Sequence, residues 1–374
     1  MREKSRKTAI EAILSSIMKK YKPNELPCLT EQYETWLQQR PLDGVKIFDA
    51  TPLFHNTLSK FIPLLAGGAE LTVGIHDRFN HDPEIAALLK KIGIPVAYND
   101  FYGSDEDIVL DCAAIHSQKS PAYGFVELTR SGEHVFARSE KPCISVDRSV
   151  IKYFEDSLGT ADGLMRALEN LNIPVAGKKI VLFGYGKVGS GIAHRLIREN
   201  ASLTVVEDLR QIVPVGAARW IDFRQKELLE IAASKADIII TSTGVPGIIC
   251  KNYNSKIFTE SSALLINMGA EDEFGECIKA TRALNQKYPL NFMLSEPTRL
   301  RYLDATFALH NESALILLDN PTPEPGLHKT SDKIESRLIW QTLEKSIIRE
   351  EAAAFLNRHQ QKNMEAFKNV QPAD

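Results

Sequence analysis

Three glycines near the middle of the chain have the spacing of a phosphate-binding turn. Gly184, Gly186 and Gly189 fit the pattern G-x-G-x-x-G, directly after the apolar run KKIVLF and directly before the helical pattern SGIAHRLIREN. In such a turn the first glycine permits a tight bend, the second lets the backbone approach a pyrophosphate, and the third lets the helix pack close to the strand. Backbone N–H groups at the helix start then face the phosphates. The segment therefore predicts a dinucleotide site that also includes Lys187 and Val188.

A carboxylate follows the next predicted strand. Glu207 comes directly after the apolar run LTVV. A carboxylate at this position accepts hydrogen bonds from the hydroxyls of an adenosine ribose and repels a 2′-phosphate, so the sequence favours NAD over NADP. Arg210 lies close by in the sequence and weakens that preference. A packing motif without a ligand is the alternative, which the order of strand, glycines, helix and acid disfavours.

Small polar residues follow two later predicted strands. These residues are Thr241, Ser242, Thr243 and Gly244 after one strand, and Asn267, Met268 and Gly269 after the other. Ligands in open α/β sheets bind outside the carboxyl ends of the strands, so we expect these residues to line the nicotinamide half of the site. The alternative is that these residues are an ordinary transition from strand to loop.

Alternating strand and helix patterns supply the elements that position these residues. Residues 44–150 read as one βαβ series, and a second series begins at KKIVLFG, after a long helical pattern over 149–172 that is interrupted near Gly159. We predict an α/β protein with two doubly wound, Rossmann-like parallel-sheet domains. The NAD-binding domain, 158–310, is inserted between a substrate domain, 1–157, and C-terminal helices, 311–374, that complete the substrate domain.

Composition restricts the class of protein. The formal net charge of −3 gives no electrostatic case for nucleic acid or for an anionic membrane surface, and no apolar run reaches the length of a membrane span. The cysteines are odd in number and none has CxxC spacing, which predicts reduced thiols in a cytoplasmic protein without a metal site. They are Cys28, Cys112, Cys143, Cys250 and Cys277.

Four segments resemble a known family when they are taken together. GKKIVLFGYGKVGSGIAHRL, ADIIITSTG, LLINMGAEDE and LSEPTRLRYLDATFALH are similar, in that order, to the NAD-binding domain of S-adenosylhomocysteine hydrolase, over residues 142 to about 315. In that family, bound NAD oxidises the ribose 3′-hydroxyl, homocysteine is eliminated, water adds, and NADH restores the alcohol. The resemblance implies tightly bound NAD, a small-molecule substrate such as a nucleoside or thioether nucleoside, and a homo-oligomer, either a dimer or a tetramer.

The resemblance also implies catalytic residues. Lys152 matches a family lysine beside the oxidised hydroxyl, and Asp156, or its neighbour Glu155, matches an aspartate one helical turn later. A solvated lysine and an ordinary ion pair are the alternatives. His310 and His55 lie near family histidines without matching them cleanly, and structural roles are the alternative for both. Asp111 falls beside a catalytic aspartate of the family.

Two loops complete the implied cofactor contacts. Thr129-Arg130-Ser131-Gly132 stands where the family has a T-T-T-G loop that touches NAD, so Thr129 and Ser131 are candidates. Gly159 and Thr160 resemble a helix break that contacts nicotinamide.

Several positions depart from the family pattern. Cys112 replaces the second aspartate, Leu128 replaces a glutamate although Glu127 is adjacent, and Ala270 replaces a histidine. The asparagine that contacts nicotinamide falls on Tyr302 or Leu303, and the C-terminal lysine and tyrosine have no counterpart in NVQPAD. Loss of several acid–base groups, each contributing about 10²–10⁴ in rate, would suppress the usual hydrolysis.

Three functions follow as expectations. The first is an adenosylhomocysteinase-like enzyme of one-carbon metabolism that uses NAD to oxidise a nucleoside ribose with an altered active site. The second is a non-catalytic NAD(H)-binding regulatory homologue. The third is an NAD-linked dehydrogenase of the 2-hydroxyacid type, for which Glu296, Arg299 and His310 are a loose approximation of the required set.

Overall fold

The chain folds into two compact units. The computed structural model describes residues 3–99, 105–212, 214, 216–319 and 324–368, with side chains described as far as residue 358. Unit 1 comprises Met1–Phe154 and Arg299–Ala352, and unit 2 comprises Glu155–Thr298 and Ala353–Asp374. The segment NVQPAD, in which we find no counterpart of the family's lysine and tyrosine, lies outside the described residues.

Unit 1 contains a seven-stranded sheet in which all paired strands are parallel. Its order is β12-β6-β5-β4-β1-β2-β3. The strands are β1 (Lys46–Asp49), β2 (Glu70–Ile75), β3 (Val96–Tyr98), β4 (Ile108–Asp111), β5 (Gly124–Glu127), β6 (Pro142–Ser145) and β12 (Gly326–Lys329). The helices are α1 (Glu3–Lys20), η1 (Pro23–Glu25), α2 (Pro27–Gln39), α3 (Leu58–Ala66), α4 (Pro83–Lys91), α5 (Arg130–Phe136), α11 (Leu300–Asp319) and α12 (Asp332–Lys345). Strands β4, β5 and β6 are buried along their whole length, as expected for central parallel strands covered on both faces.

Unit 2 contains a five-stranded parallel sheet of order β11-β10-β7-β8-β9. When the five strands are numbered by their order in the chain and read from β9, their order in the sheet is 3-2-1-4-5. This is the doubly wound arrangement that binds dinucleotides. The strands are β7 (Lys179–Phe183), β8 (Ser202–Glu207), β9 (Arg219–Asp222), β10 (Ile238–Thr241) and β11 (Leu264–Asn267). The helices are η2 (Phe154–Gly159), α6 (Thr160–Asn170), α7 (Lys187–Arg198), α8 (Lys226–Ser234), α9 (Ile248–Asn252), α10 (Ser255–Thr259), η3 (Ala280–Arg282), η4 (Leu284–Lys287), η5 (Leu290–Met293) and α13 (Arg349–Lys368), which begins in unit 1.

Alternating side chains of β7 divide the core of unit 2 into two layers. Ile180 and Leu182 pack with α6 and α7 on one face, and Val181 and Phe183 pack with α8, α9 and α10 on the other. The continuous apolar run of this strand follows from burial on both faces. The predicted fold class, two doubly wound parallel-sheet domains, is confirmed.

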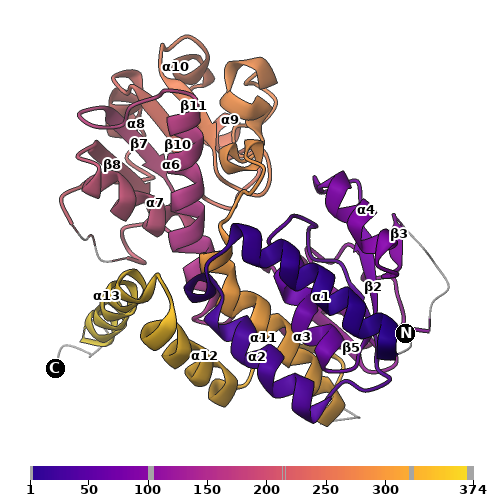
Figure 1. Cartoon of the computed structure of the whole chain (residues 1–374). Helices are drawn as coiled ribbons and strands as arrows, with labels where there is room; N and C mark the ends of the chain where they lie inside the picture. Colours follow the sequence, from indigo (N-terminus) through magenta and orange to yellow (C-terminus); the bar gives the residue numbers. More distant parts are fainter. Residues whose placement is uncertain (1–2, 100–104, 213, 215, 320–323, 369–374) are drawn as a thin grey trace. The chain divides into compact units, whose positions relative to one another are not determined.

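Helix α11 sets the second boundary between the units. It belongs wholly to unit 1, and most of its side chains are buried. It packs against α2 and α3, and Figure 1 shows this orange helix beside the indigo and violet helices from the other end of the chain. The sequence placed the boundary at residue 310, whereas the structure places it at Arg299, because α11 completes the core of unit 1 along its whole length. The structure also assigns Ala353–Asp374 to unit 2 rather than to the substrate domain.

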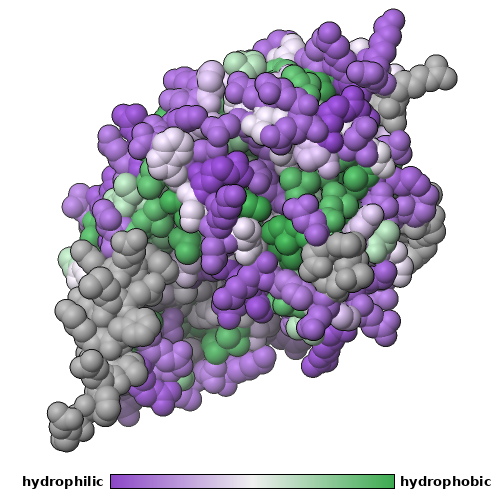
Figure 2. Space-filling model, turned by 90° about the horizontal axis from the view of Figure 1, so that it is seen from below, coloured by the Kyte–Doolittle hydropathy of each residue, from purple (hydrophilic) through white to green (hydrophobic). Residues whose placement is uncertain are grey.

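Hydrophilic residues dominate the face of the molecule drawn in Figure 2, and hydrophobic residues form separate groups on it. Large exposed hydrophobic residues are spread over several helices, including Leu37 on α2, Ile231 on α8 and Trp340 on α12. Among the helices of the described ranges, none combines the length and apolar character needed to cross a membrane.

A buried carboxylate from α11 caps α2. The residue before α2, Leu26, has no side chain that can accept hydrogen bonds, and Asp304 instead accepts them from the backbone N–H groups of Cys28 (2.9 Å) and Leu29 (3.0 Å). Burial raises the pKa of Asp304 to about 7. Proton binding at Asp304 is therefore linked to folding of unit 1.

We expect Asp304 to give unit 1 a measurable pH dependence. A carboxyl whose pKa is raised in the folded state stabilises that state fully only below the pKa that it has in the unfolded chain. The stabilisation by Asp304 is therefore lost as the pH rises from about 4 to about 7. From about pH 5 to about pH 8 the free energy of unfolding of the wild type should therefore fall by roughly 3 kcal/mol more than that of Asp304→Asn. Urea unfolding followed by tryptophan fluorescence measures this. Equal falls in the two proteins would show that Asp304 titrates normally.

Candidate functional site

The phosphate-binding turn joins β7 to α7, and two of its glycines are fixed by packing. Gly184 has φ +96°, in the left-handed region that favours glycine, and a Cβ there would lie 2.5 Å from the Ser242 carbonyl oxygen. A Cβ on Gly189 would overlap the carbonyl oxygen of Gly184. These two glycines therefore allow the tight turn and the close approach of helix to strand.

Gly186 has a different environment. It is the N-cap of α7, no side chain caps the helix there, and a Cβ added to it would meet nothing within 4 Å. Backbone N–H groups of the first helical turn, such as those of Lys187 and Val188, are donors without intrahelical acceptors. Open space beside such donors fits a pyrophosphate. The residues present therefore fit the phosphates of NAD.

Glu207 is held at the end of β8, beside this turn. Its carboxylate accepts hydrogen bonds from the backbone N–H groups of Tyr185 (2.6 Å) and Asp208 (2.8 Å), one on each oxygen. Each oxygen keeps further acceptor capacity, which the two hydroxyls of an adenosine ribose could use. Glu207 therefore holds the phosphate turn in place and can also accept hydrogen bonds from a ribose.

The polar residues after β10 and β11 bind one another. The Thr241 hydroxyl donates to Asn267 Oδ1 (3.0 Å), and Asn267 Nδ2 donates to the carbonyl oxygens of Gly269, Glu271 and Lys287. Thr241, Ser242, Asn267 and Met268 are all buried. These side chains shape the wall of the crevice outside the strand ends, and backbone groups supply much of its surface.

Sequence reasoning missed Glu273. This fully buried side chain accepts hydrogen bonds from the N–H of Thr243 (2.8 Å), the hydroxyl of Thr243 (2.9 Å) and the N–H of Gly244 (2.6 Å). Burial raises the pKa of Glu273, and these hydrogen bonds oppose the rise. Glu273 lies in the loop after β11 and fixes the loop after β10. No local spacing rule distinguishes it from Glu271 and Asp272.

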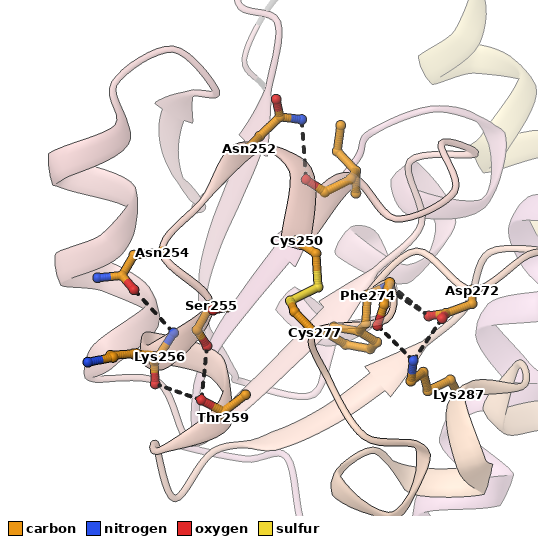
Figure 3. Close-up of a disulfide and its surroundings, with 12 residues drawn as sticks. Cys250, Asn252, Asn254, Ser255, Lys256, Thr259, Asp272, Phe274, Cys277 and Lys287 are labelled. Atoms are coloured by element: carbon orange, nitrogen blue, oxygen red, sulfur yellow. Dashed lines mark hydrogen bonds and ion pairs between the residues drawn. A yellow bond between two sulfur atoms is a disulfide. The ribbon is translucent and has the colours of Figure 1, made fainter.

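A disulfide joins this loop to α9. Cys250 and Cys277 form a disulfide (Figure 3), so the prediction of reduced thiols is wrong for these two residues. Cys28, Cys112 and Cys143 are buried thiols outside any disulfide. The error arose because spacing along the chain does not show which cysteines the fold brings together. Backbone hydrogen bonds also link Gly247 to Asp272 and Cys250 to Phe274, so the disulfide strengthens an existing contact.

Asp156 contacts the phosphate-binding turn. Its carboxylate lies 3.9 Å from the Lys187 ammonium, and the neighbouring Ser157 hydroxyl donates to the Lys187 carbonyl oxygen (2.6 Å). Both residues belong to η2, a π-helix, a conformation that occurs frequently at functional sites. The Thr160 hydroxyl donates to the carbonyl oxygen of Glu155 (3.5 Å). The boundary between the units falls between Lys152 and Asp156.

In unit 1, Asp111 and Glu127 occupy paired positions at the ends of β4 and β5. Both are fully buried, and burial raises the pKa of each carboxyl. Glu127 accepts hydrogen bonds from Thr129 and from the N–H groups of Ala113 and Ala114, both at 2.9 Å. These two alanines have left-handed φ values of 59° and 52°.

These contacts give the buried carboxylates a structural role. The strained, left-handed backbone of these two alanines is held by the hydrogen bonds of Glu127. Asp111 accepts from the N–H groups of Cys112 (2.8 Å) and His116 (3.0 Å). The Thr129 hydroxyl also lies 3.1 Å from that of Ser131. All of these groups shape the loop after β4.

The remaining candidates lie in unit 1, where Lys152 and His310 are buried and His55 is partly buried. Lys152 is 2% exposed. His310 is fully buried, its Nε2 donates to the Val126 carbonyl oxygen (3.0 Å), and burial, reinforced by the charge of Lys60, lowers its pKa well below the usual value. His55 bonds the hydroxyls of Ser16 (3.0 Å) and Tyr21 (3.3 Å), and burial lowers its pKa too. Both imidazoles are therefore hydrogen-bonded to groups of unit 1, and their catalytic roles stay predictions. Within the described ranges no cluster of His, Cys, Asp or Glu could hold a metal ion.

Unit 2 is a Rossmann-type NAD-binding domain. Three features define it: the order of its strands, the phosphate turn with open space at Gly186, and the carboxylate of Glu207 beside that turn. Residues 154–288 match the family model of the S-adenosyl-L-homocysteine hydrolase NAD-binding domain. The chain is similar to the S-adenosylhomocysteine hydrolase family, and the matched segment covers most of unit 2.

Two hydrolases are similar to this chain over much of its length. The chain is 27% identical to an S-inosyl-L-homocysteine hydrolase of Methanopyrus kandleri, over 86% of this chain and 88% of that protein. It is 29% identical to an adenosylhomocysteinase of Pyrococcus abyssi, over 66% of this chain and 64% of that protein. A solved structure of dipicolinate synthase from Bacillus subtilis superposes with a TM-score of 0.47 at 15% identity, covering 75% of this chain and 99% of that one.

Two alanine variants should separate binding from folding in the phosphate turn. Gly186→Ala places a methyl group in open space, so the fold should persist while NAD affinity falls roughly 10- to 100-fold. Gly189→Ala places the same group against the Gly184 carbonyl and should lower the free energy of unfolding of unit 2 by about 1–3 kcal/mol. Calorimetric titration and urea unfolding measure both effects. Unchanged NAD affinity in Gly186→Ala would remove this turn from the site.

The disulfide should stabilise unit 2. Replacing both Cys250 and Cys277 by serine should lower its free energy of unfolding by about 3 kcal/mol, because the unfolded chain is no longer constrained. Dithiothreitol should destabilise the wild type comparably and leave the double variant unchanged, which serves as the control. Thermal unfolding with and without the reductant checks this, and a wild type insensitive to dithiothreitol would contradict it.

Proposed function

We propose that this protein is an NAD-dependent enzyme that oxidises a ribose hydroxyl of a nucleoside or thioether nucleoside. The observation that carries the proposal is the phosphate turn of unit 2, in which Gly186 faces open space and Glu207 is fixed beside it. Bound NAD supplies a hydride acceptor. The family match supports ribose as the group that is oxidised, and the names of the two relatives support S-nucleosyl homocysteines as the substrate class.

Lys152 is the proposed base. It is a buried lysine in the segment that leads into η2, and it matches the family lysine. A lysine within hydrogen-bond reach of the ribose hydroxyl takes up the proton of that hydroxyl as hydride leaves. Asp156, near Lys187, is proposed to position η2 rather than to transfer a proton.

The hydrolytic half of the family reaction is proposed to be weakened. Cys112 and Ala270 stand at acid–base positions of the resembling family. Asp111, which precedes Cys112, and its register partner Glu127 are fully buried and accept hydrogen bonds from backbone N–H groups. Oxidation of the ribose needs none of these groups, whereas elimination and addition of water need a general acid and base.

A non-catalytic NAD-binding role is the second candidate. The burial of His310 and its hydrogen bond to Val126 favour it, because this imidazole is committed to the core. The same observation counts against a 2-hydroxyacid dehydrogenase, which requires a histidine that reaches the substrate.

Nucleoside-dependent reduction of bound NAD tests the proposal. Adenosine, inosine and their homocysteine thioethers should each be added to the NAD-loaded protein, and at least one should produce the absorbance band of NADH. Lys152→Ala should slow this step by about 10²–10⁴ without changing NAD affinity. Lys235→Ala, at an exposed lysine of unit 2, is the matched control and should react like the wild type. If none of these compounds reduces NAD while NAD binds normally, the non-catalytic candidate replaces the enzyme.

A further inference from the structure

Charged residues gather at the carboxyl ends of β8 and β9. The two strands are paired in parallel, and their last residues, Glu207 and Asp222, are register partners. The loops that follow therefore start side by side. Each loop contributes an arginine, Arg210 after β8 and Arg224 after β9.

Asp208 fixes the orientation of Arg210. The guanidinium donates from Nε to Asp208 Oδ1 (3.0 Å) and from Nη2 to Asp208 Oδ2 (2.8 Å), a bidentate arrangement that fixes the plane of the group. The Asp208 side chain is 11% exposed, whereas the Arg210 side chain is 70% exposed. Hydrogen bonding to Arg210 holds the pKa of Asp208 far below its usual range, so the pair stays ionised. An exposed guanidinium is thus held in one plane by a largely buried carboxylate.

Arg224 is fixed in a similar way. It donates from Nε to Asp222 Oδ1 (2.6 Å) and from Nη2 to Asp208 Oδ1 (3.0 Å), so Asp208 joins the two arginines. Its guanidinium lies 5.1 Å from the centroid of the Phe223 ring. The result is a small surface of planar groups, Arg210, Arg224 and Phe223, which we call the arginine wall.

The arginine wall occupies the part of the crevice that adenine must reach. A dinucleotide whose pyrophosphate lies at Gly186 and whose adenosine ribose lies at Glu207 extends its base over the ends of β8 and β9. We propose that the arginine wall stacks against the adenine ring of NAD, with Asp208 as the residue that positions it. Planar guanidinium groups stack on aromatic rings, and orientation in advance reduces the entropy lost on binding.

The charges of the region argue against a site for a 2′-phosphate. Three carboxylates, those of Glu207, Asp208 and Asp222, accompany the two guanidinium groups. The positive charge of the arginine wall is thus offset by these carboxylates, and Glu207 repels a phosphate on the ribose. A neutral base is therefore a better occupant than a second anion. The inference rests on NAD binding in unit 2, and it does not depend on the proposed ribose oxidation.

Calorimetric titration of the full chain with NAD, ADP-ribose and nicotinamide mononucleotide tests the arginine wall. Arg210→Ala and Arg224→Ala should each weaken NAD and ADP-ribose binding by roughly three- to thirty-fold. Binding of nicotinamide mononucleotide, which has a phosphate but no adenine, should stay unchanged. Arg219→Ala, an exposed arginine at the opposite end of β9, is the matched control and should bind all three ligands like the wild type.

Arg210→Lys separates stacking from charge. Lysine keeps the positive charge without the planar group, so this variant should lose most of the affinity that Arg210→Ala loses. Full affinity in Arg210→Lys would overturn stacking in favour of simple charge attraction. NAD affinity unchanged in both alanine variants, or tighter binding of NADP than of NAD by the wild type, would also overturn the inference. Each of these outcomes is read from binding alone, so failure of ribose oxidation does not affect it.

Discussion

Carboxylates that accept hydrogen bonds from backbone N–H groups hold the loops at the carboxyl ends of both sheets. Glu207 fixes the phosphate turn, Glu273 fixes the loop after β10, and Glu127 fixes the loop after β4. Glu273 and Glu127 are fully buried, and a buried ionisable group is costly unless its hydrogen bonds are made, so these two carboxylates are stable only while their loops keep the observed path. The crevice of unit 2 therefore depends on side chains that work through the backbone.

The two units have diverged to different extents. Unit 2 has the packed glycines of the phosphate turn and the acid at the end of β8. In unit 1, Cys112 stands where the family resemblance implies an aspartate, and the carboxylates beside it are engaged with backbone N–H groups. This difference is why we propose that ribose oxidation is kept while hydrolysis is weakened.

Sequence reasoning identified what is local and missed what depends on tertiary contact. The glycine turn, Glu207 and the strand patterns were predictable because each arises within a few residues of one element. The end of the NAD-binding domain was misplaced because the burial of α11 depends on α2 and α3, from the other end of the chain. Glu273 and the pairing of Cys250 with Cys277 were missed for the same reason, since their partners lie far along the sequence. The roles assigned to Lys152 and Asp156 stay predictions.

The position of the disulfide has a consequence for how the crevice responds to its surroundings. Cys277 is exposed and Cys250 is partly exposed, so small thiols in the medium can reach the bond. Once it is opened, the segment that carries Glu273 is held by the burial of Phe274, by the hydrogen bonds of Glu273 to Thr243 and Gly244, and by a few main-chain hydrogen bonds. The stiffness of the wall on the β10–β11 side thus varies with the ambient redox potential, while the wall on the β8–β9 side, built from ion pairs, does not.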